Sequence, residues 1–199
     1  MTLSRRRIGL LTLAPAALLA LAGCASTPSG IRYSSARTPE PWSIHWIEVD
    51  PARVELEVAV ARDQVLGRET PSSMARRHDA DAAVNGGFFV VRGPFAGDFE
   101  GLFVWDGRIL SEPVHERSSL AFCSDGRVWI DQFALTMEAR MENGPPFRVD
   151  GINRQRREGE TVVFSPAFGP STINQGTEVV VDRGRVVEVT GGGSRIPRD

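Results

Sequence analysis

The sequence predicts an α+β fold class: a β-rich domain with a mixed sheet and few helices, preceded by a signal peptide and a flexible tether. Short stretches that alternate apolar and polar residues recur along the chain and end at turn signals such as Asp-Gly, which is the pattern of strands joined by tight turns. One segment, residues 70–78, has the start signals of a helix instead. The first 23 residues have the charge and hydropathy pattern of an export signal.

The N-terminus is expected to be a signal peptide over residues 1–23. Three arginines at residues 5–7 precede the apolar stretch 8–22, which is shorter than the roughly 20 apolar residues of a membrane span. The sequence Leu-Ala-Gly-Cys that follows and ends at Cys24 resembles the bacterial lipobox. This resemblance implies lipidation of Cys24, and hence a membrane-anchored lipoprotein of the cell envelope that faces the periplasm or the exterior.

After the signal, the chain is expected to continue as a tether and then as one domain. Residues 24–41 are rich in Ser, Thr, Pro and Gly, a composition typical of flexible linkers. Residues 42–199 are numerous enough for one domain with its own core. The first strands are expected at residues 44–49, before an Asp-Pro turn signal, and at residues 54–60, where apolar and polar residues alternate.

One helix and three hairpins complete the expected elements. Thr70 suits a helix cap and Pro71 suits the first helical position, so a helix is expected there. It leads into a short apolar strand before Asn85. Further along, turn signals that end in glycine separate pairs of strand-like segments, and these hairpins are expected over residues 102–110, 120–132 and 177–189.

Composition excludes several kinds of chemistry. The chain contains no Lys, so Schiff-base catalysis and a Lys general base are excluded. A formal net charge of −2, without a basic block after the signal, argues against nucleic acid as a partner. Three separate histidines and no cysteine cluster argue against a zinc site. No metal or cofactor is expected, although an oxygen-ligated cation such as calcium stays open because acidic residues are plentiful.

The segment around Asn85, Gly86 and Gly87 is the first candidate for ligand binding. It interrupts a short apolar run and is followed by two phenylalanines. Asn and Gly tolerate positive φ, and two residues without a Cβ let a ligand approach backbone amides closely. A hairpin turn explains the same residues equally well, since Asn-Gly between apolar runs is a strong hairpin signal.

The second candidate is the segment with Asp150, Asn153, Arg154 and Arg156. If it is a strand, the two arginines project from the same side, and together they form a fork suited to a phosphate diester. The alternative is a charged edge that simply faces water. The third candidate comprises residues 164–166, 171–174 and 176–181, which include Thr172 and Glu178. Glu178 begins a strongly apolar strand, where a carboxylate either stays at the rim or is held by a cation. A solvated glutamate at the rim of a strand is the alternative for Glu178.

The order of these motifs resembles that of the phosphodiester glycosidases. Five motifs stand in the order of that family, within about residues 42–199: the Asn85 segment, the hairpin at 101–107, Arg117 with the turn at 125–126, the 151–156 segment and 172–181. The family includes an animal enzyme that removes a phosphate-linked N-acetylglucosamine to uncover mannose 6-phosphate. It also includes bacterial relatives described as exopolysaccharide biosynthesis proteins.

The resemblance implies hydrolysis of a sugar-1-phosphodiester at the anomeric C–O bond, with a phosphorylated glycan as partner. That reaction needs cations or amides on the phosphate and a carboxylate near the anomeric carbon. The expected substrate-binding residues are Asn85, Gly86, Gly87, Asn153, Arg154, Arg156 and Thr172. The expected catalytic carboxylates are Glu178, which is preferred, and Asp150, with Asp98 and Glu100 as further candidates.

The chain departs from the family at its C-terminus. In the family a further segment with an Asn-Leu-Asp-Gly-Gly-Gly-Ser-like motif follows the last strand pair, and residues 190–194 match it only in part. The domain at 42–199 is therefore expected to be the N-terminal part of the family domain, truncated. The alternative function is a non-catalytic lipoprotein that binds anionic glycans through the same residues.

Overall fold

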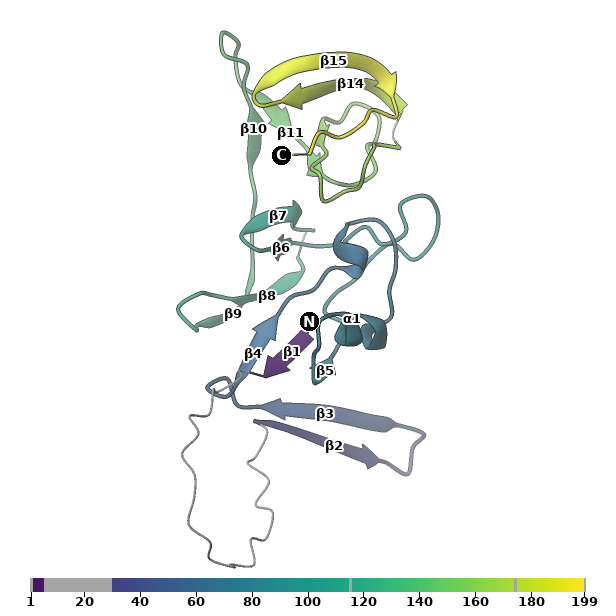
Figure 1. The fold of residues 1–199 in the computed structure, drawn as a ribbon, viewed down its shortest axis with the longest axis vertical. Helices are drawn as coiled ribbons and strands as arrows, with labels where there is room; N and C mark the ends of the chain where they lie inside the picture. Colours follow the sequence, from purple (N-terminus) through teal and green to yellow (C-terminus); the bar gives the residue numbers. More distant parts are fainter. Residues whose placement is uncertain (1, 6–29, 115, 174, 199) are drawn as a thin grey trace, which may run out of the picture. The chain divides into compact units, whose positions relative to one another are not determined.

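The computed structural model describes residues 2–5, 30–114, 116–173 and 175–198. In this part of the chain strands dominate and one α-helix is present (Figure 1), so the β-rich character expected from the sequence is confirmed. The chain divides into two compact units. Unit 1 comprises Met1–Val58 and Pro71–Val84, and unit 2 comprises Ala59–Thr70 and Asn85–Asp199.

Unit 1 contains an antiparallel three-stranded sheet in the order β4-β1-β5. Its strands are β1 (Thr2–Arg5), β4 (Val54–Glu57) and β5 (Ala82–Ala83). The helix α1 (Pro71–Arg77) begins at Pro71, as the sequence predicts, because proline's fixed φ suits the first helical turn. After the helix, Nδ1 of His78 lies 2.8 Å from a carboxylate oxygen of Glu57, the last residue of β4.

Unit 1 also contains a hairpin, in which β2 (Ile31–Arg37) pairs with β3 (Ser43–Val49) over seven residues each. The strand expected at 44–49 is thus present, but part of the expected tether at 24–41 is a strand as well. Tyr33 explains the difference, because its hydroxyl lies 2.5 Å from Nδ1 of His45 and the two rings stack at 5.9 Å. Such aromatic cross-strand pairs stabilise hairpins.

Most of the expected signal peptide, and Cys24 with it, lies outside the described residues. The exception is β1, which occupies the middle of the unit 1 sheet. Across the described ranges, the structure has no helix with the length and hydropathy needed to span a bilayer.

Unit 2 begins with a short 3-10 helix, η1 (Ala61–Asp63), and continues as paired strands. Antiparallel pairs join β6 to β7, β8 to β9, β10 to β11 and β14 to β15, whereas β12 and β13 are parallel. Their bounds are β6 Phe103–Trp105, β7 Arg108–Ser111, β8 Ser118–Phe122, β9 Val128–Gln132, β10 Met137–Ala139, β11 Phe147–Val149, β12 Gly151–Ile152, β13 Val162–Val163, β14 Gln175–Asp182 and β15 Arg185–Gly192.

The three hairpins predicted in this region are confirmed. At the tip of the first, Asp106 and Gly107 both have positive φ, at 51° and 74°, which is the backbone of the tight turn that Asp-Gly favours. The described strands of unit 2 form two-stranded pairs and not the single mixed sheet expected from the sequence.

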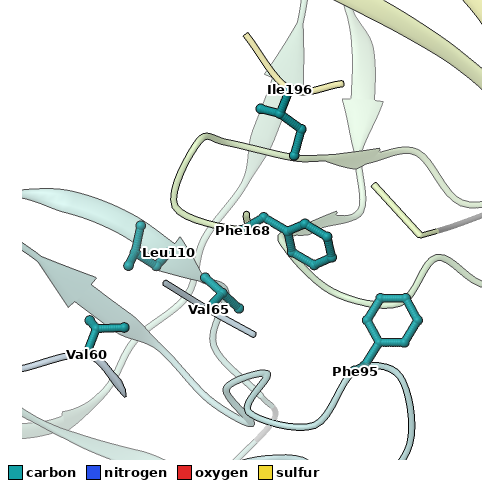
Figure 2. Close-up of a cluster of buried hydrophobic side chains, with 6 residues drawn as sticks. All are labelled: Val60, Val65, Phe95, Leu110, Phe168 and Ile196. Atoms are coloured by element: carbon teal, nitrogen blue, oxygen red, sulfur yellow. The ribbon is translucent and has the colours of Figure 1, made fainter. Parts of the chain in front are cut away.

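The core of unit 2 brings together residues that are far apart in the sequence (Figure 2). Phe168 is fully buried, and its ring lies near those of Phe95 and Phe164, at 6.2 and 4.7 Å. The other buried members of the cluster are Val60, Val65, Leu110 and Ile196. This core fixes the segments that carry the polar residues described next.

Candidate functional site

The Asn85 segment begins the second part of unit 2, Asn85–Asp199, and residues 85–87 are exposed. None of these three residues has a positive φ. The positive φ that Asn-Gly-Gly permits is therefore not used at these three residues. After this segment, the N–H of Glu100 donates to the carbonyl of Phe88 at 3.0 Å, and Phe89 pairs with Phe99.

This pairing places the Asn85 segment beside a stretch of acidic residues at 98–100. Arg117 strengthens the link, because its guanidinium lies 4.8 Å from the ring centroid of Phe88 and donates to the carbonyl of Glu100 at 2.7 Å. The Oγ of Ser111 donates to the carbonyl of Phe99 at 3.2 Å. The end of β7 is thereby held against the same stretch.

Asn153 is completely buried and holds three segments together. Its Nδ2 donates to the carbonyl of Leu110 and to Oγ of Ser165, both at 3.1 Å. Its Oδ1 accepts from the N–H of Ser165 at 2.8 Å. Its φ of 53° is tolerated because Asn is favoured in the left-handed region. The structure thus places Asn153 as a structural residue of the loop and not at a substrate-accessible surface.

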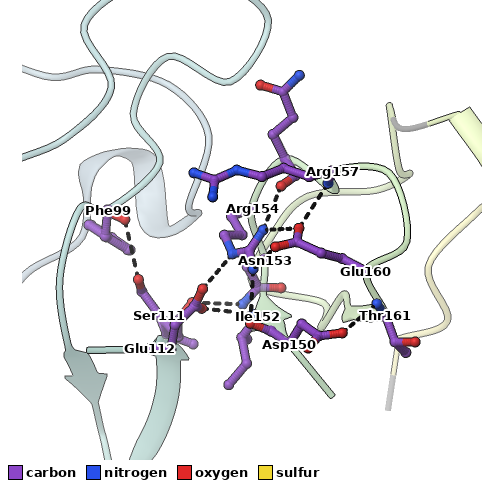
Figure 3. Close-up of polar contacts among 12 residues, drawn as sticks. Phe99, Ser111, Glu112, Asp150, Ile152, Asn153, Arg154, Arg157, Glu160 and Thr161 are labelled. Carbon is purple, nitrogen blue, oxygen red and sulfur yellow. Dashed lines mark hydrogen bonds and ion pairs between the residues drawn. The ribbon is translucent and has the colours of Figure 1, made fainter. Parts of the chain in front are cut away.

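Arg154 is the centre of an arginine–carboxylate cluster (Figure 3). Its Nε donates to Glu112, and Nη1 and Nη2 donate to the two carboxylate oxygens of Glu160 at 2.7 and 3.1 Å. Nη1 and Nη2 also donate to the carbonyls of Gln155 and Asp150, both at 2.8 Å. A guanidinium has five N–H groups, so all of them are engaged with protein acceptors. Although burial opposes it, these hydrogen bonds raise the pKa of Arg154 above its usual value.

The fork of Arg154 and Arg156 expected from strand alternation does not form. The strand β12 ends at Ile152 and the chain turns at Asn153, so the two arginines do not share a strand face. Nη1 of Arg156 donates to the carbonyl of Arg157 at 3.1 Å. The position of Gly151 requires a glycine, because a Cβ there would overlap the guanidinium of Arg154, which Glu112 and Glu160 hold in place.

The two expected catalytic carboxylates, Glu178 and Asp150, both accept hydrogen bonds from backbone N–H groups. Both carboxylate oxygens of Glu178 accept from Oγ1 of Thr172, at 2.8 and 2.7 Å, and one also accepts from the N–H of Ser194 at 2.9 Å. Burial acts to raise the pKa of Glu178, but the hydrogen bonds from Ser194 and Thr172 outweigh it and lower that pKa. Asp150 accepts from the N–H of Thr161 at 2.9 Å and pairs with Nε of Arg148 at 3.0 Å.

Asp98 differs from these carboxylates because part of it has no partner. The residue is 6% exposed, and its Oδ1 is buried and accepts no hydrogen bond from the described residues. Burial, together with the negative charges of Glu112 and Glu100, raises the pKa of Asp98 to about 7 against the opposing charge of Arg154. A buried carboxyl with a pKa near neutrality is the usual form of a general acid.

Sequence reasoning did not single out Glu112 and Glu160, which neutralise Arg154. Glu112 is 42 residues away from Arg154 along the chain, and Glu160 is six. The only sequence signal for Glu112 is its position directly after the buried end of β7, where a carboxylate needs a partner. Glu160 has no comparable signal.

Metal binding has no support among the described residues, because no three His, Cys, Asp or Glu side chains are grouped to hold an ion. Of the expected site residues, Arg154 and Asp150 share a hydrogen bond, whereas Asn153 bonds to Leu110 and Ser165. Thr172 and Glu178 form a separate pair.

Comparisons of this chain with protein-family models, with curated proteins and with solved structures found no match. The class of protein is therefore argued from the arrangement of its own residues.

Proposed function

We propose that this chain is a membrane-anchored lipoprotein that hydrolyses sugar-1-phosphodiester linkages in envelope or extracellular glycans. The observation that carries the proposal is the Asp98 carboxyl, which is buried, has an oxygen without a partner and has a pKa raised to about 7, so that a large fraction of it is protonated near neutral pH. Because that oxygen is buried in this structure, contact with a substrate requires the 98–100 segment to open. It lies in the segment that pairs with the residues following Asn85, and Glu112 and Arg154 are close enough to affect its pKa.

In the proposed reaction, protonated Asp98 donates its proton to the oxygen that links the anomeric carbon to phosphorus. The anomeric C–O bond breaks, and water adds to the anomeric carbon. The added water loses one proton to the solvent, and the Asp98 carboxylate takes one proton back from the solvent. The products are a reducing sugar and a phosphate monoester. Glycosidases generally use a protonated carboxyl in this way. Glu112 and Arg154 act as positioning residues, because they set the charge around Asp98.

In this proposal the exposed amides of residues 85–87 hold the phosphate, whereas Arg154 needs to exchange a carboxylate partner before it binds one. Glu178 is no longer the preferred catalytic carboxylate. Its oxygens are engaged with Thr172 and Ser194, and a carboxylate with a lowered pKa is a poor general acid.

The test is hydrolysis of an N-acetylglucosamine 1-phosphodiester by the purified full chain in ¹⁸O-labelled water. Reducing sugar should appear, and the label should enter the sugar and not the phosphate, because the C–O bond breaks. Asp98→Asn should lose at least about 100-fold in rate, the usual contribution of a general acid. Asp106→Asn, in an exposed turn of the same unit, is the matched control. Equal rates for the two variants would remove Asp98 from the mechanism.

A non-catalytic glycan-binding lipoprotein is the second candidate, and the engagement of the Glu178 and Asp150 carboxylates with donors of the protein itself favours it. The same experiment separates the two: binding of the phosphodiester without release of sugar supports the second candidate and rejects the first.

The lipid anchor is proposed from the lipobox-like sequence at Cys24. Cys24→Ala should move the protein from the membrane fraction to the soluble fraction after cell lysis. Membrane association that persists in this variant would reject the anchor.

A further inference from the structure

Unit 2 carries an open hollow of about 470 Å³ that contains none of the residues discussed above. Its lining includes Asp63, Gln64, Arg108, Pro166, Pro170 and Arg198. We call it the Arg108 hollow. Its volume lies within the range of small-molecule sites, roughly 300–1,000 Å³.

Much of the lining of the Arg108 hollow is close in sequence to residues of the unit 2 core, which Figure 2 shows. Gln64 precedes Val65, Pro166 and Pro170 flank Phe168, and Arg198 follows Ile196 by two residues; all three core residues are buried. The N–H of Val65 donates to the carbonyl of Ala167 at 2.7 Å. The N–H of Ile196 donates to the carbonyl of Pro170 at 3.0 Å. The hollow is thus preformed, which lowers the entropy cost of binding a ligand.

One wall is also held in an unfavourable backbone conformation. Arg62 and Asp63 have φ of 53° and 56°, a region that is unfavourable for residues other than glycine. The carboxylate of Glu69 fixes this turn by accepting the N–H of Arg62 at 2.9 Å. Such conformations are concentrated at ligand-binding segments.

Two arginines, Arg108 and Arg198, and one carboxylate, that of Asp63, line the Arg108 hollow, so its charge is positive and favours an anion. Arg108 and Arg198 are both exposed, and within the described residues neither forms an ion pair. Elsewhere in unit 2, Arg117, Arg148 and Arg154 are all paired with carboxylates. Two unpaired guanidiniums at one hollow suit the several oxygens of a phosphate group.

The remaining lining suits a sugar. The side chain of Gln64 supplies a donor and an acceptor of the kind that sugar hydroxyls need, and Pro166 and Pro170 supply apolar surface for a ring face. We propose that the Arg108 hollow binds a phosphorylated sugar, with Arg108 and Arg198 on the phosphate. The sugar part rests on the proposed function, since it makes the hollow a second subsite for the same class of glycan.

The test is calorimetric titration of the full chain with glucose 1-phosphate at low ionic strength, with glucose and inorganic phosphate as parallel ligands. Glucose 1-phosphate should bind more tightly than either. Arg108→Ala/Arg198→Ala should weaken its binding by about 100-fold, about tenfold for each lost charge-assisted contact. Arg140→Ala/Arg185→Ala removes the same charge from exposed positions in unit 2 and should change the affinity little.

Equal binding by the two double variants would overturn the site, and inorganic phosphate binding as tightly as glucose 1-phosphate would overturn the sugar part. Titration does not require turnover, so the outcomes are separable from those of the hydrolysis assay. If the chain hydrolyses the phosphodiester but its binding of glucose 1-phosphate does not depend on Arg108 and Arg198, only the proposed site in the hollow is rejected. Binding without hydrolysis rejects only the proposed activity.

Discussion

Replacing Asn153 with Ala tests whether this residue is a structural link between three segments. The substitution removes the partner of the buried Leu110 carbonyl and of the Ser165 N–H. A buried polar group without a partner costs about 1–3 kcal/mol. Ala at a φ of 53° costs a further 1 kcal/mol or so. The expected loss of unfolding free energy is therefore about 3 kcal/mol.

The assay is thermal and urea unfolding of the full chain. At roughly 2–4 °C per kcal/mol for a protein of this size, the midpoint should fall by about 6–12 °C. Asn143→Ala lies in an exposed turn and should stay within about 0.5 kcal/mol of the unchanged protein. Asn153→Gly should be about 1 kcal/mol more stable than Asn153→Ala, because glycine accepts positive φ. If Asn153→Ala and Asn143→Ala unfold at the same midpoint, the linking role is refuted.

Three further predictions concern stability. Burial raises the pKa of Asp98 from 3.8 to about 7. The folded protein should therefore lose stability as pH rises between these two values, by up to about 4 kcal/mol. Urea titrations should show that Asp98→Asn removes this loss. The pKa of Glu178 is lowered from 4.5, so its contribution should be complete above that pH and lost below it, and Glu178→Gln should flatten the acid side of the same profile. Gly97→Ala should destabilise the protein by about 1–3 kcal/mol more than Gly126→Ala in thermal unfolding. Both glycines have positive φ, but a Cβ at Gly97 overlaps the neighbouring backbone whereas one at Gly126 meets open space.

The sequence was most informative where structure depends on neighbouring residues. The turn at Asp106 and Gly107 and the start of the helix at Pro71 were predicted because turn and cap chemistry is local. The Asn85 segment was an exception. Its residues permit positive φ but do not require it, and the structure instead has positive φ at Arg62 and Asp63, where the sequence gives no such signal.

The candidate site was harder to predict because its chemistry depends on partners that are distant in the sequence. The alternation that suggested a phosphate fork assumed that the strand continues past Ile152, and it ends there. Whether Arg154 is available depends on Glu112, which another hairpin supplies. In the same way, Glu178 looked like a free rim carboxylate until the folded chain brought Ser194 to it. Conversely, Asp98 stands out only because folding buries it.

The position of β1 has a consequence for the order of events in the cell. Thr2–Arg5 pairs on one side with β4 and on the other with β5, so residues 2–5 are hydrogen-bonded inside a sheet. If residues 1–23 are a signal peptide, a precursor that folds before export buries the first residues of its signal peptide in the unit 1 sheet. Export would then compete in time with folding of unit 1. Cleavage of the signal peptide would remove β1 and leave β4 and β5 without the strand that pairs with both of them.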